Sequence, residues 1–320
     1  MNKKRLEYLV GRVRDKVKTN YTRFKYEGKH KGMQVPWIMQ LEPTNVCNAK
    51  CTFCRRDEQG DSRGFMDFEL FKQIIDATPF ITQVHTQGYG EPLLHPRIAD
   101  MVEYARKAGK RVIFYTNGSS LSNELAMDLL EAGLSQIRFS IDAIDAEEYE
   151  KQRPPLKFNR VLENIEMFQE YRDIGGYKTS TMVRMIKGGD IEAKRKFWEE
   201  RVDSVAMSTI YYVPTQKDLQ PPMREGEPIY CVTPYQQLAI DWRGDISYCC
   251  MSMYGTGIVS NVADLGEITE KNIIKLFNSG KMKAIRDGLL LGTYPARCEW
   301  CIKDVMWGKV QSLFGEVENG

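Results

Sequence analysis

The sequence predicts an α/β protein built on a parallel sheet, followed by a smaller cysteine-rich region. Short apolar runs alternate with helical patterns six times between about residues 37 and 212, and five of the eight cysteines lie after residue 230. Serial βα units give parallel strands, so we expect an open sheet or a partial barrel. With 320 residues, 42% hydrophobic and 28% charged, the chain can bury a core as one large domain or two ordinary ones.

Each element is predicted from the spacing of its apolar residues. The strands are expected at residues 37–41, 84–87, 112–116, 137–141, 181–186 and 205–211. The helices between them are expected at 68–77, 96–108, 122–132, 159–172 and 190–201. Ala108-Gly109 and Ala132-Gly133 indicate helix ends, because glycine adopts the left-handed conformation that terminates a helix.

The two ends of the chain differ from this central part. Residues 1–35 are basic, and we expect an amphipathic helix packed on the body of the protein, with a surface for an anionic partner or a membrane as the alternative. This helix is predicted from the spacing of Leu6, Leu9, Val10, Val13 and Val17. Four prolines in 214–228 indicate a linker. We therefore expect domains at 1–35, 36–213 and 214–320.

Several classes of protein are disfavoured by composition. No apolar run approaches the ~20 residues of a membrane-spanning helix, and no secretory signal is recognisable. The net charge of +2 does not indicate a nucleic-acid binder. We expect a cytoplasmic protein whose thiols stay reduced, so the clustered cysteines indicate metal or redox chemistry.

The first cysteine group, Cys47, Cys51 and Cys54, has the spacing C-x3-C-x2-C directly after the first predicted strand. Thiolates at this spacing favour zinc or an iron–sulfur cluster. Zinc requires a fourth ligand, and the nearest histidines in sequence are His30 and His85. Three thiolates on a four-iron cluster would leave one iron open to a substrate or cofactor.

This motif resembles that of the radical S-adenosylmethionine (SAM) superfamily. In that family C-x3-C-x2-C follows the first strand of a partial (β/α)6 barrel of the TIM type, and an aromatic residue, here Phe53, precedes the third cysteine. The resemblance covers about residues 36–213. It implies that the three cysteines hold a SAM-binding [4Fe–4S] cluster, with a zinc knuckle as the alternative.

Further SAM contacts follow from the same resemblance. The run Gly88-Tyr-Gly-Glu-Pro92 matches the glycine-rich segment that holds the amino group of SAM in the family, which implies this role for Gly88, Gly90 and Glu91. Glycines at such a position let the backbone approach a ligand closely.

Polar residues at the ends of the later strands complete the predicted SAM site. Side chains at the carboxyl ends of barrel strands face the active-site mouth, which makes Asn117 and Ser140 candidates. The resemblance implies that Ser140 lies near the ribose or carboxylate of SAM. It makes Arg184 a candidate for the carboxylate, with a surface ion pair as the alternative.

The second cysteine group resembles the C-terminal SPASM and twitch extensions of radical SAM enzymes. Their motif, C-x9-15-G-x4-C with later cysteines, is matched by Cys231, Gly244, Cys249, Cys298 and Cys301. No cysteine follows Cys301, so the resemblance implies the shorter twitch type, with one auxiliary [4Fe–4S] cluster on the four cysteines. A structural zinc site is the alternative.

Cys250 is left without an assignment. A single thiol is usually a small buried hydrophobic group. It could also replace Cys249 as a ligand, or donate a hydrogen atom to a substrate radical, as in some epimerases of the family.

The resemblance implies a radical SAM oxidoreductase or epimerase that acts on a small polar substrate such as an aminocyclitol or sugar. The electron would come from a flavodoxin or a ferredoxin-type donor. Modification of a ribosomally made peptide is the alternative, made less favourable because the basic N-terminal segment is too short for a peptide-binding domain. A non-catalytic electron carrier or zinc scaffold is the third hypothesis.

Overall fold

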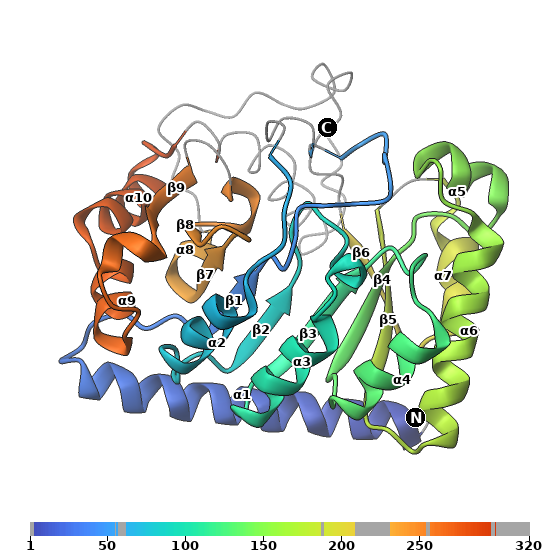
Figure 1. The fold of residues 1–320 in the computed structure, drawn as a ribbon, viewed down its shortest axis with the longest axis horizontal. Coiled ribbons are helices and arrows are strands. Elements are labelled where there is room, and N and C mark those ends of the chain that lie inside the picture. The colour runs from blue at the N-terminus through green and yellow to red at the C-terminus, as the bar shows by residue number, and fades with distance from the viewer. Residues whose placement is uncertain are drawn as a thin grey trace, which may run out of the picture.

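A nine-stranded sheet forms the centre of the computed structural model (Figure 1). The structure describes residues 3–54, 56, 62–186, 189–208, 231–253, 257–295 and 298, with the side chains of 3–12 and 251 excepted. The strand order is β6-β5-β4-β3-β2-β1-β7-β8-β9. Strands β1 to β7 are parallel, and β8 and β9 are antiparallel. The predicted α/β class with a partial barrel is confirmed.

The six predicted strands, β1 to β6, begin within one residue of their predicted starts, and β7 to β9 were not predicted. The strands are β1 Ile38–Leu41, β2 Gln83–Thr86, β3 Arg111–Thr116, β4 Gln136–Ser140, β5 Ser180–Ile186, β6 Ser204–Ser208, β7 Gln237–Ile240, β8 Asp245–Ser247 and β9 Ile258–Asn261. β7 pairs with β1, so the C-terminal region continues the barrel sheet. The predicted linker at 214–228 lies outside the described residues.

The helices also follow the predicted order. They are α1 Lys3–Lys29, α2 Phe68–Asp76, α3 Ile98–Lys107, α4 Asn123–Glu131, α5 Ala146–Gln152, α6 Phe158–Ile174, α7 Ile191–Glu199, α8 Thr233–Gln236, α9 Glu270–Phe277 and α10 Gly280–Leu291. The prediction missed α5, a short helix with little apolar periodicity. Capping side chains fix several starts: Asp67 accepts from Leu70 N–H (2.9 Å) and Asp190 from Ala193 N–H (3.0 Å).

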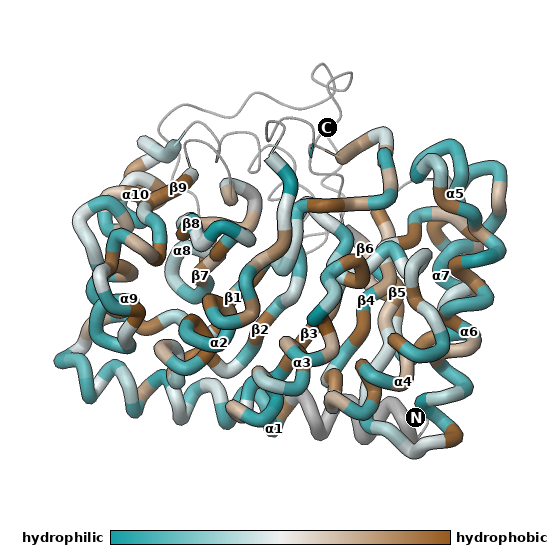
Figure 2. Tube along the Cα trace, in the orientation of Figure 1, coloured by the Kyte–Doolittle hydropathy of each residue, from teal (hydrophilic) through white to brown (hydrophobic). Residues whose placement is uncertain are grey.

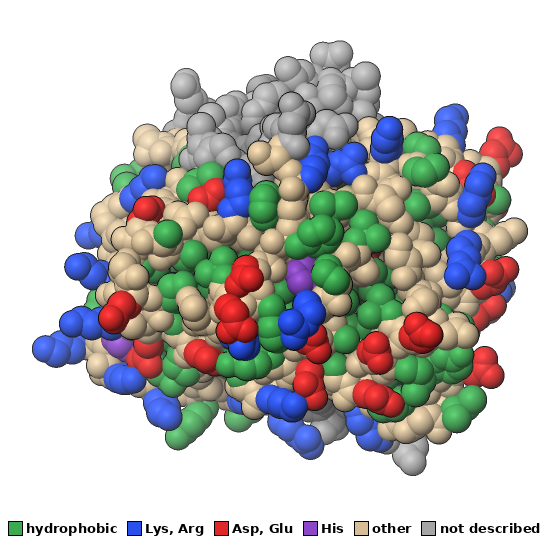
Figure 3. Space-filling model, viewed as in Figure 1, with side chains coloured by type: hydrophobic (Ala, Val, Ile, Leu, Met, Phe, Trp, Pro, Cys, Tyr) green, Lys and Arg blue, Asp and Glu red, His purple; other side chains and the backbone are tan. Residues whose placement is uncertain are grey.

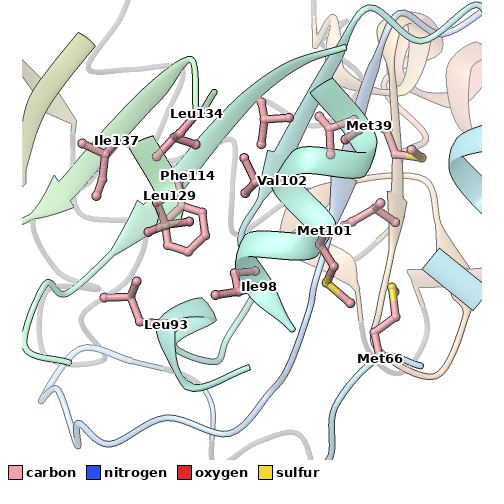
Figure 4. Packing of buried hydrophobic residues seen from close by; sticks show 14 of the residues in the cluster. Met39, Met66, Leu93, Ile98, Met101, Val102, Phe114, Leu129, Leu134 and Ile137 are labelled. Atoms are coloured by element: carbon pink, nitrogen blue, oxygen red, sulfur yellow. The ribbon is translucent and has the colours of Figure 1, made fainter. Parts of the chain in front are cut away.

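The helices cover one face of the sheet, and this decides which residues are buried. Figure 4 shows Ile98, Met101 and Val102 of α3 packed toward Phe114 of β3, and Figure 2 shows hydrophobic segments on the central strands. On β5, buried and half-buried residues alternate along the whole strand. The buried set packs under the helices, so the half-buried set lies on the opposite, inner face of the sheet.

Helix α1 crosses the amino ends of the barrel strands (Figure 1). Its inner face makes polar contacts there: Thr19 and Thr82 hydroxyls lie 3.0 Å apart, and Asp15 pairs with Arg111 at 2.9 Å. The Tyr26 ring also lies edge-on to Phe80, with 5.9 Å between centroids.

Of the apolar stripe predicted to hold α1 on the body, the residues with described side chains, Val13 and Val17, point to solvent. Val13 and Val17 are each 64% exposed, and Tyr21 and Phe24 are exposed further along the same face. That part of the prediction is wrong, because the strand ends beneath α1 offer polar and aromatic partners that match its other face. No described helix is long and apolar enough to cross a membrane. Figure 3 shows one face of the molecule, on which acidic and basic side chains are interspersed.

These contacts predict that substitutions on the two faces of α1 affect the free energy of unfolding to different extents. Val17→Ser should change the free energy of unfolding by less than about 0.5 kcal/mol, because the side chain already meets water. Tyr26→Ala should lower it by about 1–2 kcal/mol, because the contact with Phe80 is lost. Chemical denaturation under anaerobic conditions measures both. A larger loss for Val17→Ser than for Tyr26→Ala would contradict the assignment of the packed face.

Candidate active site

The first cysteine loop follows β1 at the carboxyl end of the sheet. Cys47 and Cys51 are half-buried, and Cys54 is exposed. The segment after α5 holds the loop by backbone hydrogen bonds: Lys50 N–H donates to the Pro154 carbonyl at 2.6 Å, and Thr52 N–H to the Gln152 carbonyl at 3.0 Å. The loop therefore has a fixed shape that does not depend on its thiols alone.

A network of side-chain amides and hydroxyls holds the other side of this loop. Asn48 accepts a hydrogen bond from the Asn117 amide at 3.0 Å and donates to the hydroxyls of Ser119 and Ser120 at 2.9 and 3.0 Å. The Asn117 side chain thus binds Asn48, and its predicted contact with the cofactor stays a prediction. Its place beside the loop makes it a positioning residue for the cysteines.

Arg153 lies buried beneath the loop. Its guanidinium forms an ion pair with the buried carboxylate of Asp142 and donates to Cys51 Sγ at 3.7 Å. It also stacks over Phe53, 5.0 Å from the ring centroid. Sequence analysis missed Arg153. The only local feature that marks it is that two prolines follow it in the sequence. Phe53, predicted from the family motif, therefore contacts the residue that holds the loop.

The three thiols suit a multi-iron cluster better than a single metal ion. Among the described residues, no three His, Cys, Asp or Glu side chains converge as ligands of one ion. A cluster takes one thiolate per iron, so its cysteines need not meet at one point. Burial raises the pKa of Cys47 and Cys51, and the charge of Arg153 opposes this shift at Cys51. Arg153 thus favours the thiolate that a metal requires.

The glycine-rich segment after β2 packs directly against this loop. A Cβ atom on Gly88 would lie 2.1 Å from Glu42 Oε1, and one on Gly90 would lie 2.0 Å from the Thr44 carbonyl oxygen. Only glycine allows this approach. The Tyr89 N–H donates to Glu42 Oε1 at 2.7 Å, which fixes the segment beside the cysteines.

The Glu91 carboxylate is engaged inside the protein. It accepts hydrogen bonds from the Thr116 hydroxyl (2.6 Å), the Asn117 N–H (2.7 Å) and the Leu93 N–H (3.1 Å). Burial raises the pKa of Glu91 to about 7, although these hydrogen bonds act in the opposite direction. Glu91 thus ties the glycine segment to the end of β3. Of the predicted trio, the backbone at Gly88 and Gly90 remains the better candidate for a ligand contact.

Ser140 and Arg184 occupy paired positions on β4 and β5. Both are half-buried on the inner face of the sheet, near its carboxyl end. The Arg184 guanidinium lies 5.9 Å from the centroid of the Tyr115 ring, so it faces the barrel interior. This position suits the predicted contact with a cofactor carboxylate and disfavours a purely external ion pair.

The second cysteine group gathers between β8 and the end of α10. Cys231 and Cys298 both pack against Leu289. The Tyr248 hydroxyl lies 3.9 Å from Cys298 Sγ, and burial together with Cys298 and Cys249 raises the pKa of this tyrosine. Burial raises the pKa of Cys298 to about 11. Three of the four predicted auxiliary ligands therefore surround one region, and Cys301 lies outside the described residues.

Cys250 lies at the border between this region and the barrel. A hydrogen bond with Cys249 lowers the pKa of Cys250, and a second one with Gln237 acts in the same direction. Gln237 on β7 in turn donates to Gln40 on β1 at 3.4 Å. Cys250 thus contacts a side chain that reaches the barrel strands.

The buried pair under the loop predicts a large loss of stability on truncation. Arg153→Met leaves the Asp142 carboxylate buried without its counter-charge, which should cost about 3–5 kcal/mol. Arg160→Met on the exposed surface of α6 is the matched control and should change little. Urea denaturation compares the two. Equal stability of both variants would show that the pair does not hold the loop.

The raised pKa of Glu91 predicts that the free energy of unfolding depends on pH. Its folded-state pKa of about 7 lies above the ordinary value of 4.5, so folding favours the protonated form. Its contribution is present below pH 4.5 and is lost as pH rises through 7, by about 3 kcal/mol. Glu91→Gln should remove this slope, while Glu124→Gln, at an exposed position, should keep it. A difference between wild type and Glu91→Gln that stays constant with pH would refute the assignment.

Comparison with known proteins supports this reading of the two cysteine groups. The radical SAM superfamily model matches residues 41–195, and the model of the iron–sulfur cluster-binding domain SPASM matches residues 231–303. A tungsten-containing aldehyde ferredoxin oxidoreductase cofactor-modifying protein of Pyrococcus furiosus is 31% identical over 46% of this chain and 43% of its own. The AdoMet-dependent heme synthase of Methanosarcina barkeri is 31% identical over 42% and 40%. Each match spans less than half of the curated relative.

Solved structures share the fold at low sequence identity. BtrN in complex with AdoMet and 2-DOIA has a TM-score of 0.52 and 17% identity, covering 81% of this chain and 89% of its own. Streptococcus suis SuiB bound to its precursor peptide SuiA has a TM-score of 0.63 and 14% identity, covering 84% and 72%. The radical SAM model covers the loop of Cys47, Cys51 and Cys54 after β1. The SPASM model covers the described thiols beyond β7, which are those of Cys249, Cys250 and Cys298. The chain is therefore a radical SAM superfamily member with a C-terminal SPASM-type iron–sulfur domain, and its cofactors are SAM and iron–sulfur clusters.

Proposed function

We propose that this chain is a radical SAM oxidoreductase or epimerase that acts on a small polar substrate. The observation that carries the proposal is the inner face of the sheet below the cysteine loop, which is polar and only partly covered. Gln40, His85, Tyr115, Arg138 and Arg184 all lie on it, and the last four are half-buried. A purely electron-carrying or structural protein has no need for such a face.

The cysteine loop and the inner face would bind different parts of the cofactors. Cys47, Cys51 and Cys54 would hold the cluster, while the backbone at Gly88 and Gly90 and the side chains of Ser140 and Arg184 would orient SAM. A cluster held by these cysteines would supply the one electron that reductive cleavage of SAM requires, and cleaved SAM would provide the group that takes hydrogen from the substrate. The protein supplies placement and excludes competing reactions.

Two outcomes follow from the second cysteine group. In a dehydrogenase, the substrate loses a hydrogen atom, a proton and an electron in total, and the auxiliary cluster on Cys231, Cys249, Cys298 and Cys301 would accept the electron. In an epimerase, Cys250 would return a hydrogen atom to the opposite side of the substrate, and its thiyl radical would be restored by a proton from solvent and one electron from the auxiliary cluster, which the electron donor would reduce again. The contact of Cys250 with Gln237 favours the epimerase, because it places the thiol at the edge of the barrel.

Peptide modification is the second candidate. SuiB bound to SuiA has the higher TM-score, 0.63 against 0.52 for BtrN. The small substrate is preferred because the polar side chains that carry the proposal lie on the inner face of the barrel sheet, within the fold itself. An electron donor of the flavodoxin or ferredoxin type is part of the proposal in either case.

The experiment uses the reconstituted holoenzyme with SAM, dithionite and extract fractions separated into small molecules and peptides. We expect the small-molecule fraction to increase 5′-deoxyadenosine formation and the peptide fraction to leave it unchanged. The reverse result would favour peptide modification. No 5′-deoxyadenosine under any condition would overturn the radical function.

The same assay in D2O tests Cys250. Wild type should place solvent deuterium at one carbon of the product, because a thiol exchanges its hydrogen with water. Cys250→Ala and the isosteric Cys250→Ser should both still form 5′-deoxyadenosine but lose at least about 90% of this product, since neither supplies a thiol. Unchanged product in both variants would refute Cys250 as the hydrogen donor, whereas a wild-type product that has lost two hydrogens and carries no solvent deuterium would indicate the dehydrogenase outcome.

A further inference from the structure

The inner face of the barrel carries a group of basic and aromatic side chains that the SAM contacts do not include. Arg138 on β4 lies opposite Tyr115 on β3, and the Arg138 guanidinium lies 4.9 Å from the centroid of the Tyr115 ring. The His85 ring on β2 lies 6.0 Å from the same tyrosine. We call Arg138, Tyr115 and His85 the interior basic cluster.

The hydrogen-bond partners of Arg138 are neutral. Its Nε donates to Gln136 Oε1 at 2.8 Å, and one terminal nitrogen donates to the Tyr115 hydroxyl. Across the described part of the chain, no carboxylate forms an ion pair with Arg138. A half-buried guanidinium without a counter-charge is unfavourable unless a bound anion compensates it.

The surroundings add to the positive potential at this place. The described strands β1 to β6 contain no Asp or Glu, whereas β3, β4 and β5 each contain an arginine. Three acidic residues lie close to the ends of these strands and are engaged elsewhere: Glu42 after β1 accepts the Tyr89 N–H, Asp142 after β4 pairs with Arg153, and Asp203 before β6 pairs with Arg172. The potential acts on His85: burial first, then the charges of Arg138, Arg111 and Arg184, lower its pKa to about 3.

His85 is therefore neutral at neutral pH and can donate from one ring nitrogen. Its Nε2 is buried and has no hydrogen-bond partner among the described residues. The Tyr115 hydroxyl accepts from Arg138, so its own proton is available for another acceptor. Arg138 and His85 thus both lie beside the Tyr115 ring on the inner face, and the His85 Nε2 has no described acceptor.

The cluster is distinct from the predicted SAM contacts. Along β4, Arg138 precedes Ser140 by two residues on the same face, so it lies one layer deeper in the barrel, away from the cysteine loop. Ser140 pairs with Arg184, and Arg138 pairs with Met182. A molecule held by SAM contacts at the upper layer would leave Arg138 facing the space below it.

We propose that Arg138, with Tyr115 and His85, binds an oxyanion group of the substrate, either a carboxylate or a phosphate ester. This inference rests on the proposed function, because it assigns the chemical class of the substrate at that site. A charged guanidinium and two neutral donors are the groups that recognise such oxygens. A neutral sugar would leave the guanidinium uncompensated.

The test is isothermal titration calorimetry of the oxidised holoenzyme, with saturating SAM and no reductant, against inorganic phosphate and against succinate. We expect binding of at least one anion, weakened about 10- to 100-fold in Arg138→Gln. Arg138→Lys should retain part of the affinity, and Arg160→Gln on the surface should match wild type. Binding of phosphate alone would assign a phosphate ester, and binding of succinate alone a carboxylate.

Two results would overturn the inference: no binding of either anion to wild type, or equal binding to wild type and Arg138→Gln. SAM affinity measured on each variant reports whether the upper layer of the site remains intact. The cleavage of SAM by dithionite is scored separately. If wild type bound anions but never formed 5′-deoxyadenosine, the proposed function would fail while the anion site would stand.

Discussion

The buried ion pair between Asp142 and Arg153 is the interaction on which the geometry of the site depends. Asp142 follows β4 and also accepts the Ile186 N–H at the end of β5 at 2.6 Å. Arg153 extends from this pair to Cys51 and Phe53 in the loop after β1. One buried pair therefore connects the carboxyl ends of the neighbouring strands β4 and β5 with the cysteine loop after β1. Two buried charges are tolerated because each is hydrogen-bonded on more than one side.

The same end of the sheet brings Glu91 into contact with the end of β3. Parallel strands place all their carboxyl ends at one edge, so residues far apart in sequence meet there without long connections. The side chains of Glu91 and Asn117 both hold loops at this edge. The backbone of the glycine segment and the half-buried side chains of the inner face are the groups that we propose for ligand contacts.

Sequence analysis predicted what depends on local patterns. The strands, most helices and the cysteine spacing follow from periodicity and from a motif contained in eight residues. The roles of Glu91 and Asn117 could not be predicted, because they are set by partners from other loops. Arg153 was missed for the same reason: its partners, Asp142 and Cys51, are 11 and 102 residues away. The exposed stripe on α1 shows that an apolar periodicity predicts a helix but not the face that packs.

Side chains alternate between the two faces of the sheet along the strands, so rigid packing and ligand binding can be served by different residues. The outer face is apolar and packs under the helices, which keeps the strand ends and the cysteine loop in a fixed geometry. The inner face can then change its polar side chains without disturbing that packing. This explains how BtrN and SuiB share the fold with this chain at 17% and 14% identity while their structures hold different ligands. This is why the proposal assigns recognition of the substrate to inner-facing positions such as 85, 115 and 138 and not to the loop that carries the cysteines.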